Sequence, residues 1–109
     1  MSRISITENG EKTGRFFDDK KADLYKEDEK HDGHNFISEA TGSQWEHEAI
    51  YCTKGGVYVL NHYSQYQGSR ETYEIISKEE AAGWFVKNNY EDESLPDELK
   101  KQVADLEIQ

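Results

Sequence analysis

The sequence predicts an α+β domain: an antiparallel sheet, a meander of about five or six strands, with two C-terminal α-helices packed on one face. Two observations predict it. Short segments rich in Ile, Val, Tyr and Thr follow one another up to residue 76, with turn residues between them. After residue 77, apolar side chains recur at spacings of three and four, the period of a helix. A chain of 109 residues has the size of a single domain, 1–109.

The first predicted hairpin lies at the N-terminus. Residues 4–7 alternate between apolar and polar side chains, as a short strand does. Asn9-Gly10 favours a tight hairpin turn, because both residues tolerate positive φ angles. Residues 15–17 are expected to form the returning strand.

The next part of the chain is more polar. Residues 22–27 fit either a third strand or a short helix capped by Asp18 or Asp19, and we favour the strand. Residues 27–44 are predicted to form a polar loop. A loop of this length is uncommon in a compact domain and is often either mobile or functional.

Residues 45–76 are expected to form a three-stranded meander, with strands at 45–53, 57–64 and 72–76. The register of the first pair depends on the turn between them. If Gly55 and Gly56 are the only turn residues, Cys52 pairs with Val59. A three-residue turn would shift the register and reshuffle the faces. With the two-residue turn, one face carries Ile50, Cys52, Val57 and Val59, and the other carries Tyr51, Tyr58, Leu60, His47 and His62.

The helical part begins at a well-marked boundary. Ser77 is a good N-cap, and Glu80 three residues later completes a capping box. The helix is expected to run from residue 78 to about residue 89. Residues 91–95 form an acidic linker, in which Ser94 is expected to cap the last helix.

The chain carries a net charge of −10, most of it near its end. Residues 71–109 hold eleven acidic and four basic side chains. Such a surface repels phosphate backbones, so direct binding of nucleic acid is disfavoured. Cys52 is the one cysteine, which excludes an intramolecular disulfide and favours a reducing compartment. No apolar run approaches the roughly 20 residues of a membrane span, and no signal-peptide core opens the chain, so we expect a cytoplasmic protein without a membrane anchor.

Groups that could perform catalysis or bind a metal do not form a known motif. The zinc spacings are missing, and His47-Glu48 lacks the second histidine of HExxH. With a two-residue turn, Cys52 lies on the face opposite His47 and His62, so only two ligands share a face. Cys52 is also expected mid-strand, where no helix N-terminus stabilises a thiolate. Since the phosphate-binding glycine motifs are missing as well, we expect no enzyme, no metal and no cofactor.

Tyrosines are frequent in the predicted sheet and its loops. A tyrosine offers a large rigid surface with a polar hydroxyl, which is favourable at an interface. If the helices cover one face of the sheet, part of the other face presents tyrosines to a partner. The predicted partner-binding surface consists of Tyr51, Tyr58, His62, Tyr63, Tyr66 and Arg70.

Four segments of the chain resemble small bacterial proteins of unknown function. They read WEHE from Trp45, GGVYVL from Gly55, SQYQGS from Ser64 and EAAGW from Glu80. The resemblance covers half of the chain at most. It implies no activity and no site residues, so none is transferred to this chain.

These observations favour a small non-enzymatic module, monomeric or homodimeric, that binds another protein or regulates it. Two alternatives stay open. One is an acidic inhibitor that imitates the phosphate charge of a nucleic acid and occupies the groove of a basic partner. The other is a small-ligand binder or enzyme that uses His47 and His62 on one face of the sheet.

Overall fold

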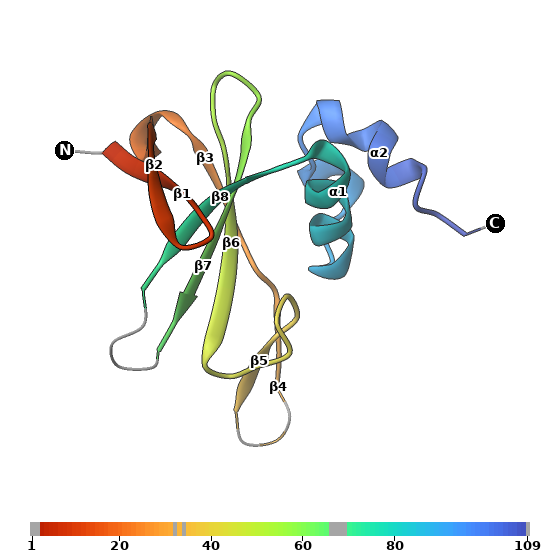
Figure 1. Cartoon of the computed structure of the whole chain (residues 1–109). Coiled ribbons are helices and arrows are strands. Elements are labelled where there is room, and N and C mark those ends of the chain that lie inside the picture. The colour runs from red at the N-terminus through yellow and green to blue at the C-terminus, as the bar shows by residue number, and fades with distance from the viewer. Residues whose placement is uncertain (1–2, 32, 34, 66–69, 109) are drawn as a thin grey trace.

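A computed structural model gives the fold of residues 3–31, 33, 35–65 and 70–108 (Figure 1). All strand pairs are antiparallel and the helices are C-terminal, so the predicted α+β class is confirmed. The strands are β1 (Arg3–Glu8), β2 (Glu11–Asp18), β3 (Asp23–Lys26), β4 (Glu29–His31), β5 (Phe36–Ser38), β6 (Glu46–Cys52), β7 (Tyr58–Ser64) and β8 (Thr72–Ile76). The α-helices are α1 (Lys78–Lys87) and α2 (Lys100–Ala104), and the 3-10 turns are η1 (Asp19–Lys21), η2 (Asp92–Ser94) and η3 (Asp97–Leu99).

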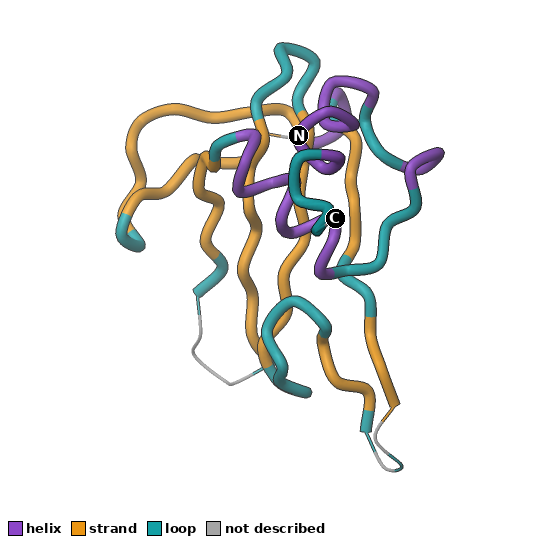
Figure 2. The backbone as a smooth tube through the Cα atoms, turned by 90° about the vertical axis from the view of Figure 1, so that its right-hand side faces the viewer, coloured by secondary structure: helices purple, strands orange, loops and turns teal. Residues whose placement is uncertain are grey.

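The described strands number eight rather than five or six, and they form three sheets. The central sheet has the order β3-β6-β7-β8, which confirms both the meander and the strand interpretation of residues 22–27. Hairpin β1–β2 lies over one face of this sheet and the helices lie over the other (Figure 1). We call these the hairpin face and the helix face. Figure 2 looks onto the helices, with the strands of the central sheet behind them.

Within residues 27–44 the chain forms the hairpin β4–β5, which the sequence analysis did not predict. The rings of His31 and Phe36 face each other across it at 4.9 Å. Ser38 is fully buried, and its hydroxyl donates to the Glu27 carboxylate at 2.6 Å. The two strands have three residues each and mostly polar side chains. Such strands carry too little alternation to be recognised from sequence.

The turn between β6 and β7 corrects the predicted register. The Thr53 N–H donates to the Val57 carbonyl and the Gly56 N–H donates to the Thr53 carbonyl, both at 2.9 Å. Three residues, 54–56, therefore lie between Thr53 and Val57, whose backbones bond to each other next to the ends of the two strands. Gly56 has a φ of +80°, the left-handed conformation that closes a three-residue turn and that glycine adopts at low cost.

The longer turn shifts the pairing of β7 by one residue, so that Cys52 faces Tyr58 instead of Val59. Because side chains alternate along a strand, every β7 side chain changes face relative to the prediction. The helix face carries Ile50, Cys52, Tyr58, Leu60 and His62, and the hairpin face carries His47, Ala49, Tyr51, Val59, Asn61 and Tyr63.

The main core lies on the helix face. Ile50, Tyr58, Phe85 and Leu99 are each less than 2% exposed. They come from the sheet, from α1 and from η3, so this core joins the C-terminal part of the chain to the meander. A smaller core of Ile6, Phe17 and Val59 joins hairpin β1–β2 to the other face.

The predicted capping box at the start of α1 is confirmed. The Ser77 hydroxyl accepts from the Glu80 N–H at 3.1 Å, and the Glu80 carboxylate accepts from the Ser77 N–H at 3.3 Å. The helix ends at Lys87, about two residues earlier than expected. Asn89 stops it by taking a left-handed φ of 63°.

The segment after α1 begins with 3-10 turns instead of a helix capped by Ser94. These turns place Leu95 and Leu99 in the main core, and α2 follows them. The Tyr58 hydroxyl donates to the Glu98 carboxylate at 2.5 Å. This hydrogen bond ties the C-terminal segment to the sheet.

The tyrosines make the stability of the fold sensitive to alkali. Burial is the first cause that raises the pKa of all six described tyrosines above its ordinary value: Tyr25, Tyr51, Tyr58, Tyr63, Tyr73 and Tyr90. In the unfolded chain each of these hydroxyls loses its proton near pH 10. Stability is therefore fully present below about pH 10 and falls as the pH rises further, because the unfolded chain loses protons first. Urea unfolding should give a lower free energy of unfolding at about pH 11 than at about pH 8, and equal values would contradict this.

The single thiol should be protected by the fold. Cys52 is 9% exposed, and burial raises the pKa of its thiol, as does the nearby Glu98 carboxylate. Since the thiolate is the reactive form, a chromogenic disulfide reagent should modify the native protein at least about 100-fold more slowly than the urea-unfolded chain. Equal rates would show that the thiol is accessible in the native state.

Candidate binding surface

The hairpin face of the central sheet is covered only in part. Phe17 of hairpin β1–β2 packs on Tyr51 and Tyr73, with ring centroids 5.2 and 6.2 Å apart. Beyond this contact a depression of about 270 Å³ crosses all four strands of the sheet. We call it the tyrosine groove. Its lining includes Leu24, Lys26, Tyr51, Asn61, Tyr63 and Tyr73.

Three neighbouring strands supply the tyrosines of this groove. Tyr51 lies on β6, Tyr63 on β7 and Tyr73 on β8. The rings of Tyr51 and Tyr73 are 6.4 Å apart. At the other end, the Tyr63 ring stacks on His47 at 5.4 Å. Aromatic surface therefore extends from the hairpin to the far end of β6.

Carboxylates surround the hydroxyls of this groove. The Tyr73 hydroxyl donates to the Glu71 carboxylate at 2.5 Å. The pKa of Tyr51 is raised by burial first and then by Asp19 and Glu71. The pKa of Tyr63 is raised by burial first and then by the charges of Glu27 and Glu29. The tyrosines consequently remain neutral over the physiological pH range and keep hydroxyls that can donate a hydrogen bond.

A buried polar network supports the end of the groove at His47. The Glu27 carboxylate lies 2.6 Å from His47 Nδ1 and accepts from the Glu48 N–H at 2.7 Å and from the Ser38 hydroxyl at 2.6 Å. The Glu27 and His47 side chains are only 6% and 10% exposed. Since Ser38 donates to the carboxylate and not to the imidazole, these groups lack the order of a Ser-His-acid triad. Their contacts join the end of β3 to β5 and β6.

The predicted surface residues do not all lie together. Tyr51 and Tyr63 are both in the tyrosine groove. Tyr58 is 1% exposed in the core of the helix face, so it offers no area to a partner. Arg70 is exposed at the end of the loop before β8, and Tyr66 lies outside the described residues.

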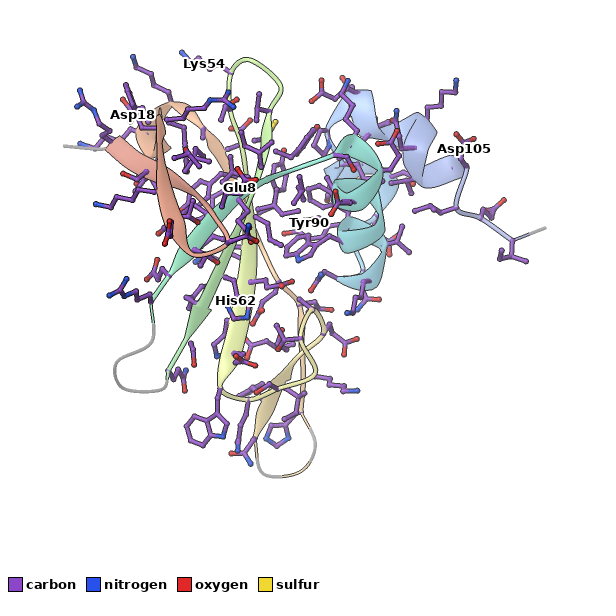
Figure 3. All side chains as sticks on the ribbon, viewed as in Figure 1. Glu8, Asp18, Lys54, His62, Tyr90 and Asp105 are labelled. Atoms are coloured by element: carbon purple, nitrogen blue, oxygen red, sulfur yellow. The ribbon has the colours of Figure 1, made fainter. Side chains whose placement is uncertain are left out.

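His62 belongs to the helix face, where its Nε2 is 4.0 Å from the Glu46 carboxylate (Figure 3). On the same face the Trp84 indole donates to Glu48 at 3.1 Å. Burial is the main cause that raises the pKa of Glu48, and the Trp84 hydrogen bond opposes it. His47 is on the hairpin face, so the expectation that His47 and His62 share a face was wrong. The three-residue turn separates them.

A second depression, of about 380 Å³, lies beside the end of α1 and includes Asp28, Asn88 and Asn89. The polar groups of these three residues already have partners. Asn88 accepts from the Asp28 N–H at 2.9 Å, and the Asn89 amide donates to the Asp28 carboxylate at 2.7 Å. These contacts fasten α1 to the end of β3, so the groups that make them are not available to a ligand.

Tyr73 on this surface and Glu27 beneath it were not among the predicted site residues. Tyr73 could have been found from its position on the strand next to β7. Glu27 carried no comparable signal, because its partners are residues 38, 47 and 48, which are distant in the sequence, and residue 38 lies on the unpredicted hairpin β4–β5.

Comparison with family models, with curated proteins and with solved structures gives no match to this chain. The resemblance to small bacterial proteins therefore stays a prediction. In the described part of the chain, no helix is both long enough and apolar enough to cross a membrane. The same residues contain no group of three or more His, Cys, Asp or Glu side chains arranged to hold a metal ion.

Removal of the Glu27 carboxylate should destabilise the protein. Glu27→Ala leaves His47, Ser38 and the Glu48 N–H without their acceptor, so the free energy of unfolding should fall by about 3 kcal/mol. The neighbouring Glu29→Ala removes an exposed carboxylate and should change it by less than about 0.5 kcal/mol. Urea unfolding of the two variants measures the difference. Equal losses would contradict a structural role for the buried network.

Proposed function

We propose that this chain is a small non-enzymatic interaction module that binds another protein through the tyrosine groove. The observation that carries the proposal is that Tyr51, Tyr63 and Tyr73 all line the depression beside hairpin β1–β2 on this face of the sheet. Tyrosine is enriched among the residues that dominate binding energy, since it buries much area and loses few rotamers.

The form of the groove supports a protein partner more than an enzymatic substrate. It runs across four strands and is lined by side chains of a regular sheet, which fix their positions without the partner. A preformed surface loses little conformational entropy on binding. The acid–base pair at the end of the groove, Glu27 and His47, is buried, and its carboxylate already has three partners.

The alternative of an acidic inhibitor would use another part of the molecule. Glu91, Asp92 and Glu93 are exposed in the segment after α1, on the helix side. Binding through these residues would depend strongly on salt and would be insensitive to changes in the tyrosine groove. The alternative that relies on His47 and His62 has lost its geometric basis, because the two side chains lie on opposite faces.

Capture of a partner from a lysate of the native host, followed by affinity measurements with the purified pair, tests the proposal. Tyr63→Ala should raise the Kd at least about tenfold, or about 1.4 kcal/mol, because it removes an aromatic anchor from the groove. Phe36→Ala is the matched control. It removes a ring that is 62% exposed outside the groove, and it should change the Kd by less than about twofold.

The reverse pattern would contradict the proposal. If Phe36→Ala weakens binding and Tyr63→Ala does not, the partner binds the hairpin β4–β5 instead. If neither change matters and binding disappears at high salt, the acidic segment after α1 is the interface.

A further inference from the structure

We infer that the tyrosine groove recognises a basic side chain of its partner, with arginine preferred over lysine. The inference rests on the proposed function and specifies the chemistry of the partner. It follows from the distribution of charge along the groove, from an unpartnered buried acceptor beside it, and from the properties of the tyrosine rings themselves.

The charge of the groove is polarised. At the β8 side, the Glu71 carboxylate is held in place by the Tyr73 hydroxyl. The groove's own cation, Lys26, lies on β3 at the opposite edge of the central sheet. Three strand spacings, about 14 Å, separate these edges, so the carboxylate of Glu71 is closer to Tyr73 than the ammonium group of Lys26 is.

Asp19 adds a second carboxylate, near Tyr51 of the groove. It follows β2 in the turn η1, two residues after Phe17, whose ring packs on Tyr51 and Tyr73. Its charge contributes to the raised pKa of both tyrosines, as expected for a carboxylate close to their hydroxyls. The Asp19 Oδ1 atom is buried and has no hydrogen-bond partner among the residues that the structure describes. A buried acceptor without a partner is costly, and a donor from a ligand would satisfy it.

The tyrosine rings add a second attraction for a cation. The face of an aromatic ring is negative, so a guanidinium or ammonium group over it is favoured. Arginine fits best, because its planar guanidinium can stack on a ring and still donate several hydrogen bonds to nearby carboxylates. An ammonium group lacks that planar shape. Arginine is therefore the side chain that matches rings and carboxylates together.

A peptide titration followed by NMR of the labelled protein tests this inference. The probe is the acetylated and amidated peptide Gly-Ser-Arg-Ser-Gly, and the control peptide has citrulline, the uncharged isostere, in place of arginine. Ring resonances of Tyr51 and Tyr73 should shift saturably with the arginine peptide. The citrulline peptide should bind at least about tenfold more weakly, because it keeps the shape and loses the charge.

Two variants with the same change in net charge make the test specific. Glu71→Gln removes the carboxylate in the groove and should raise the Kd of the arginine peptide at least about fivefold. Glu93→Gln removes an exposed carboxylate on the helix side and should change it by less than about twofold. Similar effects of the two variants would overturn the inference, since the peptide would then respond only to net charge.

Other outcomes separate this inference from the proposed function. Equal binding of the two peptides, or no saturable shift at millimolar concentration, would overturn recognition of a basic side chain. The effect of Tyr63→Ala on the captured partner would still report whether the groove is the interface. If dilution alone shifts the tyrosine resonances and neither peptide does, the groove binds a second copy of this chain, and the inference is also overturned.

Discussion

The three-residue turn at residues 54–56 determines which side chains of β6 and β7 share a face of the central sheet. It sets the pairing of β6 with β7, and through β7 it sets the side chains that β8 adds to each face. Gly56 makes the turn possible, since its left-handed backbone would strain a residue with a side chain. With one residue fewer in the turn, Tyr58 would leave the core and Tyr63 would replace a residue on the helix face.

The two faces then differ in how completely they are covered. On the helix face, α1 and the C-terminal turns bury Ile50 and Tyr58, and the hydrogen bond from Tyr58 to Glu98 holds the turns in place. On the hairpin face, β1–β2 covers only the part around Phe17 and Val59. The uncovered part keeps its tyrosines at the surface. The proposed interaction surface is consequently a result of the same register that builds the core.

The sequence was sufficient for features that depend on local signals. The capping box at Ser77, the meander and the fold class follow from turn residues, propensity and periodicity within short windows. Features that depend on distant partners could not be predicted. Ser38 at the end of β5 donates to the buried Glu27 carboxylate, a contact between side chains eleven residues apart. The positions of Tyr58 and His62 depend on whether the glycine turn has two or three residues. Because the turn has three residues, Tyr51 and Tyr63 of the predicted surface lie together in the groove. Tyr58 is buried in the core of the opposite face.

The most direct test is to measure the register between β6 and β7. Interstrand nuclear Overhauser contacts in the labelled protein report which backbone positions face each other. Contacts are expected between Cys52 and Tyr58 and between Ile50 and Leu60. Contacts between Cys52 and Val59 instead would put Tyr63 on the helix face, away from Tyr51. That result would contradict the existence of the tyrosine groove and with it the proposed interface.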